Sequence, residues 1–233
     1  MSKHGKDKCK EKCKTDTYNL YYDDFSQGFV PGIPGSPYSY FSGPDFSGND
    51  AAGGVVVVPN SLTVNSTPFT FTAPNNNDNI KYFVYKNQPF NAPMQGEIVF
   101  ETIMSSQQTG LGGLPDCLSA VNASVSGVNN VNSDMRLADS VFAVLDFASF
   151  LFFGFMLTNE DIYVMYEVSP LGKPQFGGPG PDYDAFSSLV PIEKRNVDDP
   201  LGDFVKLSIG YNYDQTNIRQ ITRILRLISS HFT

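Results

Sequence analysis

Residues 140–170 read SVFAVLDFASFLFFGFMLTNEDIYVMYEVSP, and this stretch predicts the fold class more strongly than any other part of the chain. Phe150 to Leu157 is almost wholly apolar, and Ile162 to Val168 is dense in β-branched and aromatic residues. The four polar residues between them, Thr158 to Asp161, are typical of the turn of a β-hairpin. We therefore predict two antiparallel strands, the first of them buried on both faces in the middle of a sheet.

The second strand of this hairpin has two faces of different character, because successive side chains alternate along a strand. One face carries Ile162, Val164 and Tyr166. The other carries Tyr163, Met165 and Glu167. Since this second face is partly polar, we expect it to line a groove.

A membrane-spanning helix is the rival interpretation of the same stretch. Such a span needs about 18–20 apolar residues. Asp146 and Glu160 confine the apolar run to the residues between them, and Gly154 and the many phenylalanines favour a strand. The sequence therefore predicts no membrane span here.

Composition agrees with an all-β fold. The 233 residues include 19 Phe, 12 Tyr, 20 Gly and 16 Pro but no Trp, which indicates many short strands separated by turns. A β-sandwich of this length is commonly one domain, so we expect a single sandwich over residues 18–233. We predict strands at residues 55–58, 62–72, 80–85, 96–104, 185–192 and 203–213, and one short helix near 134–142.

Charge is distributed unevenly along the chain. Six lysines against Asp7 and Glu11 give residues 1–14 a net charge of +4, so the other 219 residues carry −12 of the total −8. An acidic body argues against nucleic acid as a partner. We predict that residues 1–17 form a disordered basic tail, and no signal peptide is visible within it.

Three cysteines are too few for a disulfide scaffold. Cys9 and Cys13 lie in the lysine-rich tail, where neighbouring positive charge favours thiolate formation. We interpret them as solvent-exposed thiols that can cross-link subunits when oxidised, and a metal clip with His4 is the alternative. Cys117 is expected to be a small, unreactive residue. The sequence predicts no metal site and no cofactor, and adjacent Asp23 and Asp24 are interpreted as a solvated turn.

The predicted strand at residues 96–104, GEIVFETIM, places Glu97 and Glu101 on one face and Ile98, Phe100, Thr102 and Met104 on a core face. Two carboxylates on one face suggest a glycosidase. Residues four apart on a strand are about 13 Å apart, however, whereas the two carboxyl groups of glycosidases lie roughly 5–9.5 Å apart. Glu97 and Glu101 alone therefore do not form a catalytic pair, and a solvated or sugar-facing strand is the better interpretation.

Three segments carry a resemblance to a known family: RLADSVFAVLDFASFLFFGFMLTNEDIYVMYEVSP at 136–170, YYDDFSQGF at 21–29 and DFVKLSIGYNYD at 203–214. Together they resemble a family of uncharacterised proteins with a concanavalin A-like jelly-roll fold. The resemblance implies two stacked antiparallel sheets, one of them concave. Related laminarinase-like enzymes carry an E-x-D-x-x-E cluster on one strand, whereas Glu97 to Glu101 has Val99 in place of the central acid.

The chain departs from the family pattern after Asp214. Ile218, Ile221, Leu225 and Ile228 recur at three- and four-residue steps, which predicts an amphipathic helix. The alternative is an altered terminus that pairs as a strand.

We expect a non-catalytic binding or structural module, either contacting glycans or taking part in a surface or particle assembly. The candidate ligand-binding residues are Tyr163, Glu167, Glu97 and Glu101, since a tyrosine beside carboxylates can stack on a sugar and hydrogen-bond it. The alternative is a divergent glycan-active hydrolase or lyase of the concanavalin A-like superfamily. The sequence does not fix the localisation. The two alternatives are the surface of a particle, such as a spore coat or a virion, and the cytoplasm.

Overall fold

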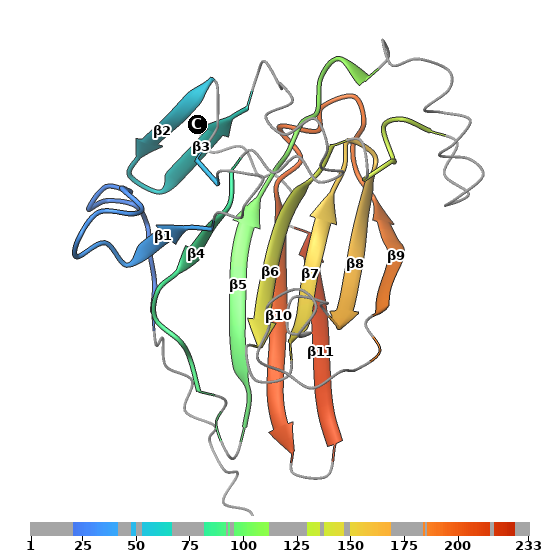
Figure 1. The fold of residues 1–233 in the computed structure, drawn as a ribbon. Helices are drawn as coiled ribbons and strands as arrows, with labels where there is room; N and C mark the ends of the chain where they lie inside the picture. The colour runs from blue at the N-terminus through green and yellow to red at the C-terminus, as the bar shows by residue number, and fades with distance from the viewer. Residues whose placement is uncertain are drawn as a thin grey trace, which may run out of the picture. The chain divides into compact units, whose positions relative to one another are not determined.

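The computed structural model describes residues 21–41, 48–49, 53–66, 82–91, 93, 96–111, 130–135, 138–146, 150–168, 184, 186–214 and 217–226. Within these ranges it contains eleven β-strands and no α-helix, so the predicted all-β class is confirmed (Figure 1). The chain divides into two compact units, Met1–Phe90 and Asn91–Thr233. The predicted tail, with Cys9 and Cys13, lies outside the described residues, as does Cys117.

The first unit contains two small antiparallel pairs. Strand β1 (Tyr38–Tyr40) pairs with β4 (Val84–Lys86), and β2 (Gly54–Val58) pairs with β3 (Ser61–Asn65). Pro59 and Asn60 connect β2 to β3, and Asn60 has a left-handed φ of 65°. Proline followed by asparagine with positive φ is the pattern of a type II turn, which explains why the strand stops at Val58.

The second unit contains a four-stranded antiparallel sheet in the order β6-β7-β8-β9. Its strands are β6 (Ser140–Asp146), β7 (Leu151–Leu157), β8 (Asp161–Val168) and β9 (Phe186–Lys194). The predicted hairpin is confirmed as β7 and β8, in a register that pairs Phe155 with Val164. At its turn, the Thr158 amide donates to the Asp161 carbonyl at 3.0 Å, and the Asp161 amide donates to the Thr158 hydroxyl at 3.0 Å.

A three-stranded antiparallel sheet completes this unit, in the order β11-β10-β5. Its strands are β5 (Ile98–Met104), β10 (Val205–Asp214) and β11 (Asn217–Arg226). Both sheets contribute to one hydrophobic core, which contains Leu151, Phe153, Phe155, Leu157, Ile162, Val205, Leu207 and Ile209. We call the side of each sheet that lines this core its inner face and the opposite side its outer face. The predicted core faces of β5 and β10 are inner faces.

Two predicted helices are corrected by the structure. Residues 217–226 form a strand, because Ile218 to Arg226 find backbone partners along β10, and that pairing prevails over a helical spacing of apolar residues. The described part of the segment predicted as a short helix near Asp134 to Phe142 is a turn followed by the start of β6. There Phe142 and Val144 alternate toward the core and pair with Phe155 and Phe153.

The other predicted strands agree with the structure to within a few residues at the ends that lie in the described ranges, whereas no strand was predicted at β1. Strand β4 begins at Val84 rather than at residue 80, and β3 ends at Asn65, with residues 67–81 outside the described ranges. No helix long and apolar enough to cross a membrane occurs in the described ranges. The single-domain organisation over residues 18–233 stays a prediction.

Candidate functional site

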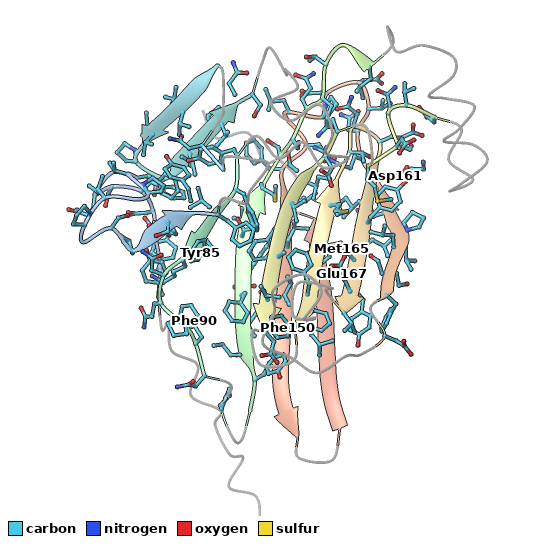
Figure 2. The ribbon with its side chains drawn as sticks, viewed as in Figure 1. Tyr85, Phe90, Phe150, Asp161, Met165 and Glu167 are labelled. Carbon is cyan, nitrogen blue, oxygen red and sulfur yellow. The ribbon has the colours of Figure 1, made fainter. Side chains whose placement is uncertain are left out.

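The four predicted ligand-binding residues lie on two different sheets. Tyr163 and Glu167 are on the outer face of the four-stranded sheet, opposite the inner residues Ile162 and Tyr166. Figure 2 labels Glu167 on β8. Glu101 is on the outer face of the three-stranded sheet, and the exposed Glu97 immediately precedes β5. Because the two outer faces point away from a shared core, the structure does not bring these two pairs together.

Tyr163 is part of a packed layer on its outer face. Its side chain is only 4% exposed, and its hydroxyl donates to the Ser133 carbonyl at 2.6 Å. Burial raises the pKa of the Tyr163 phenol. Neighbouring Met165 on the same face is also buried. A ring held in this way supports the fold and has little surface left on which a sugar could stack.

The predicted carboxylates have partners within the protein. The Ser187 hydroxyl donates to Glu167 Oε2 at 3.3 Å on the neighbouring strand β9. Lys206 Nζ lies 2.8 Å from Glu101 Oε1 and comes from the adjacent strand β10. Both pairs are cross-strand contacts near the surface, and such contacts typically contribute less than about 1 kcal/mol each to the free energy of unfolding.

One buried arginine joins the loops at the end of the second unit. Arg195 Nη1 donates to the Ser106 carbonyl at 2.8 Å and to the Thr158 carbonyl, and Nη2 donates to the Pro200 carbonyl. Asp203 Oδ2 lies 3.7 Å from Nε, and the arginine side chain is fully buried. Burial lowers the pKa of the guanidinium. Since Ser106 follows β5 and Thr158 follows β7, Arg195 ties the two sheets together.

Two acidic residues beside this arginine bind a lysine. Lys194 Nζ lies 3.1 Å from Glu160 Oε1 and 2.9 Å from Asp161 Oδ1. The hydrogen bond that Lys194 donates to the Asp161 carboxylate is the largest cause that raises the pKa of Lys194. In the described part of the chain, no group of three or more His, Cys, Asp or Glu side chains is arranged to hold a metal ion.

The first unit contains a tyrosine cluster centred on Asp23, and sequence reasoning missed it. The hydroxyls of Tyr21 and Tyr38 each donate to Asp23 Oδ2 at 2.9 Å, and the Phe25 amide donates to Oδ1 at 2.7 Å. Lys86 Nζ lies 3.1 Å from the centroid of the Tyr21 ring, a cation–π contact. Burial, followed by hydrogen bonds to Tyr21 and Asp23, raises the pKa of Tyr38.

Asp23 and Asp24 therefore stabilise a turn, as the sequence indicated. Asp24 Oδ1 accepts a hydrogen bond from the Ser26 amide at 3.0 Å. Hydrogen bonding to the Ser26 side chain, and then to its amide, lowers the pKa of Asp24. Both aspartates accept hydrogen bonds from the amide two residues further on, the pattern of Asx-turns. The YYDDF segment at residues 21–25 was the available signal, but its partner Tyr38 lies too far along the chain for a sequence pattern to find.

Strand β9 has the most exposed apolar surface of the second unit. Its large apolar side chains are between 40% and 50% exposed: Phe186, Leu189, Val190 and Ile192. Within the described residues, β9 pairs with β8 alone. We call these four side chains the β9 strip. Sequence reasoning predicted this strand but not its exposure.

Comparison with known proteins places the chain among proteins of unknown function. The model of a family described as "Family of unknown function (DUF6081)" matches residues 22–221. An uncharacterised protein of Acanthamoeba polyphaga mimivirus is 32% identical over 222 residues, which cover 73% of this chain and 49% of that protein. The chain thus spans about half the length of this curated relative. No solved structure matches the chain.

Proposed function

Since this chain belongs to that family of unknown function, we propose that it is a non-catalytic module that acts by binding or by assembly. We further propose that its two larger sheets form a concanavalin A-like jelly-roll sandwich. The antiparallel order of both sheets and their common hydrophobic core support this arrangement.

The β9 strip is the observation that carries the proposal. Phe186 and Val190 lie on the inner face of β9 and Leu189 on the outer face, and exposed apolar side chains that gather on one face of a strand typically mark a site of interaction. Strand β9 also ends its sheet within the described residues. A relative from a virus is compatible with a particle as the place of assembly.

The surroundings of the acidic residues favour binding over hydrolysis. Glu101 is paired with Lys206, and Glu167 accepts a hydrogen bond from Ser187. A glycosidase needs two carboxyl groups about 5–9.5 Å apart around one sugar. The alternative, a divergent glycan-active hydrolase or lyase, would need an acidic pair other than Glu101 and Glu167, which lie on separate outer faces.

Glycan contact is a second candidate function, and the tyrosine cluster of the first unit favours it. Tyr21 is exposed beside the Asp23 carboxylate and the Lys86 ammonium, and its sequence neighbour Tyr22 is 74% exposed. Exposed rings next to hydrogen-bonding groups can stack on a sugar and fix its orientation. The predicted carboxylates Glu97, Glu101 and Glu167 remain part of this proposal as groups that can hydrogen-bond a sugar, whereas the buried Tyr163 ring leaves little surface for stacking.

Two measurements on the full chain test these functions. Sedimentation velocity over a range of concentrations is expected to reveal either self-association or a stable complex with a partner. Val190→Asp is expected to weaken that association. Incubation with a panel of polysaccharides, following both retention and release of reducing ends, tests glycan contact, with Tyr22→Ala and Glu101→Gln as variants. Release of sugars that Glu101→Gln abolishes would overturn the non-catalytic proposal.

A further inference from the structure

The tyrosine cluster of the first unit holds the ammonium group of Lys86 against aromatic rings. Lys86 Nζ lies 3.1 Å from the centroid of the Tyr21 ring and 5.7 Å from that of the Tyr38 ring. Both distances are within the about 6 Å over which a ring face attracts a cation. Among the described residues, no carboxylate forms an ion pair with Lys86. The two rings are therefore the direct partners of this cation.

The Asp23 carboxylate supplies negative charge to the cluster, while its own oxygens are occupied. Oδ2 accepts the hydrogen bonds of both phenols, and Oδ1 accepts that of the Phe25 amide. A phenol that donates to a carboxylate is polarised toward its ionised form, so its ring attracts a cation more strongly. Burial lowers the pKa of Lys86, and the charge of Asp23 opposes that effect.

The two rings are held in place by their neighbours. Tyr38 on β1 is directly opposite Lys86 on β4, so their side chains share one face of this strand pair (Figure 1). The centroids of the Tyr21 and Tyr38 rings are 6.5 Å apart at an interplanar angle of 72°, and the Phe29 ring packs 4.8 Å from the Tyr38 ring. A site that is already ordered loses less entropy when it binds a ligand.

A site of this kind discriminates between two classes of cation. A primary ammonium has three N–H donors, each of which needs an acceptor. A quaternary ammonium has no N–H group and spreads its charge over its methyl groups, so ring faces suit it without any acceptor. Tyr21 is 39% exposed, so part of the cluster is open to solvent. The cluster thus has the composition of a quaternary ammonium site, although a lysine of the same chain occupies it.

We propose that the cluster of Tyr21, Asp23 and Tyr38 binds a trimethylated lysine of a partner protein, which replaces Lys86 in the site. The resident Lys86 shows that a lysine stem reaches these rings, which favours a lysine side chain over other carriers of a quaternary ammonium, such as choline. The charge of −12 on residues 15–233 also favours a lysine-rich partner. This inference goes beyond the proposed function, because it assigns to the first unit a ligand class of its own.

Binding of labelled peptides to the full chain tests the proposal. The probe is a fluorescein-labelled heptapeptide of Gly and Ala with one central trimethylated lysine, and its affinity is measured by fluorescence anisotropy. Saturable binding is expected. Affinity should be at least tenfold weaker for unmodified lysine and for an analogue in which carbon replaces the quaternary nitrogen. Equal binding of that uncharged analogue would overturn a site for a cation.

Replacement of Lys86 separates the resident cation from the rings that hold it. Lys86→Met keeps an unbranched apolar stem and removes the charge, so the trimethylated peptide should bind this variant at least tenfold more tightly than the original chain. Unchanged or weaker binding would contradict Lys86 as the group that the ligand replaces. No saturable binding to this variant would overturn the proposal.

Two adjacent tyrosines provide a matched pair of variants in the Lys86→Met background. Tyr21→Leu removes a ring of the cluster and should weaken peptide binding at least tenfold. Tyr22→Leu, at a side chain that is 74% exposed, should weaken it less than threefold. Circular dichroism checks that both proteins are folded, and equal losses of affinity would contradict a site built on Tyr21.

Free choline distinguishes the two sources of a quaternary ammonium. The unlabelled trimethylated peptide is expected to displace the probe at a concentration at least tenfold lower than choline does. Displacement by choline at the same or a lower concentration would assign the site to a choline headgroup and overturn the proposed lysine ligand. Neither result affects assembly through the β9 strip, since sedimentation of Val190→Asp tests that proposal on the second unit.

Discussion

Strands β7 and β9 belong to one sheet and are both rich in apolar residues, yet their environments are opposite. Phe155 on β7 is fully buried, whereas Phe186 on the same face of β9 is 48% exposed. The side chains are identical and share one face, so the difference lies in what packs against them: Phe155 belongs to the core that both sheets line, and Phe186 does not. The comparison shows that apolar composition predicts a strand without predicting whether the side chains of that strand are buried in the core or exposed.

The largest expected effect comes from removing a ring from the covered part of the inner face. Phe155→Ala should lower the free energy of unfolding by about 3–5 kcal/mol, because it removes a buried aromatic ring and leaves a cavity. Phe186→Ala should lower it by less than about 1 kcal/mol, since half of that ring already contacts water. Urea denaturation of both variants measures the difference, and equal losses would show that β9 is as well covered as β7.

The next largest loss of stability is expected from replacing Arg195, because this residue joins the loops that follow strands of the two sheets. Arg195→Met should lower the free energy of unfolding by about 2–4 kcal/mol, since three carbonyl acceptors and Asp203 lose a buried cation. Lys206→Met is the control, because its ion pair with Glu101 is exposed and should be worth less than about 1 kcal/mol. If both variants unfold at the same urea concentration, the arginine does not join the sheets.

The hydroxyl of Tyr163 is expected to have a smaller effect. Tyr163→Phe removes the hydroxyl that donates to the Ser133 carbonyl. The substitution should lower the free energy of unfolding by about 0.5–1.5 kcal/mol, because that carbonyl loses its partner. Tyr22→Phe, at an exposed ring, should leave stability unchanged. A Tyr163→Phe protein as stable as the original would indicate that water reaches Ser133.

The smallest effect is a dependence of stability on alkaline pH. Burial raises the pKa values of Tyr163 and Tyr38, so both phenols stay neutral in the fold at a pH where the unfolded chain ionises them. Their contribution is therefore fully present below the unfolded pKa of about 10 and is lost as pH rises through the folded pKa. Absorbance at 295 nm should rise at a higher pH in native protein than in protein unfolded in urea. Titration curves that coincide in the two states would contradict the burial of these two phenols.

Sequence patterns predicted the parts of the fold that are locally determined. The apolar run at Phe150 to Leu157, its polar turn and the faces of β5 and β10 follow from alternation and turn chemistry alone. The same reasoning failed at residues 217–226, because Ile218, Ile221 and Leu225 have helical spacing while the open edge of β10, a long-range feature, makes them a strand.

The candidate site was less predictable than the fold, because exposure and long-range partners decide it. Alternation correctly placed Tyr163 and Glu167 on one face of β8, but the Ser133 loop that covers Tyr163 comes from thirty residues earlier. The contacts of Arg195 with Ser106 and Thr158, and of Asp23 with Tyr38, likewise join distant segments. No local pattern contains these partners.

The central claim is that the inner face is covered at the core and open at β9, and the reaction of introduced thiols tests it most directly. Val205 is fully buried in the core, and Val190 is half exposed on β9, so the same conservative change, valine to cysteine, probes both positions. The variants are Val205→Cys and Val190→Cys in a background of Cys9→Ser, Cys13→Ser and Cys117→Ser, labelled with a thiol reagent under native conditions. The account predicts that the thiol at position 190 reacts about as fast as in the unfolded chain, and the one at position 205 at least a hundredfold more slowly. Similar slow rates at both positions would mean that β9 is covered, and would contradict the account.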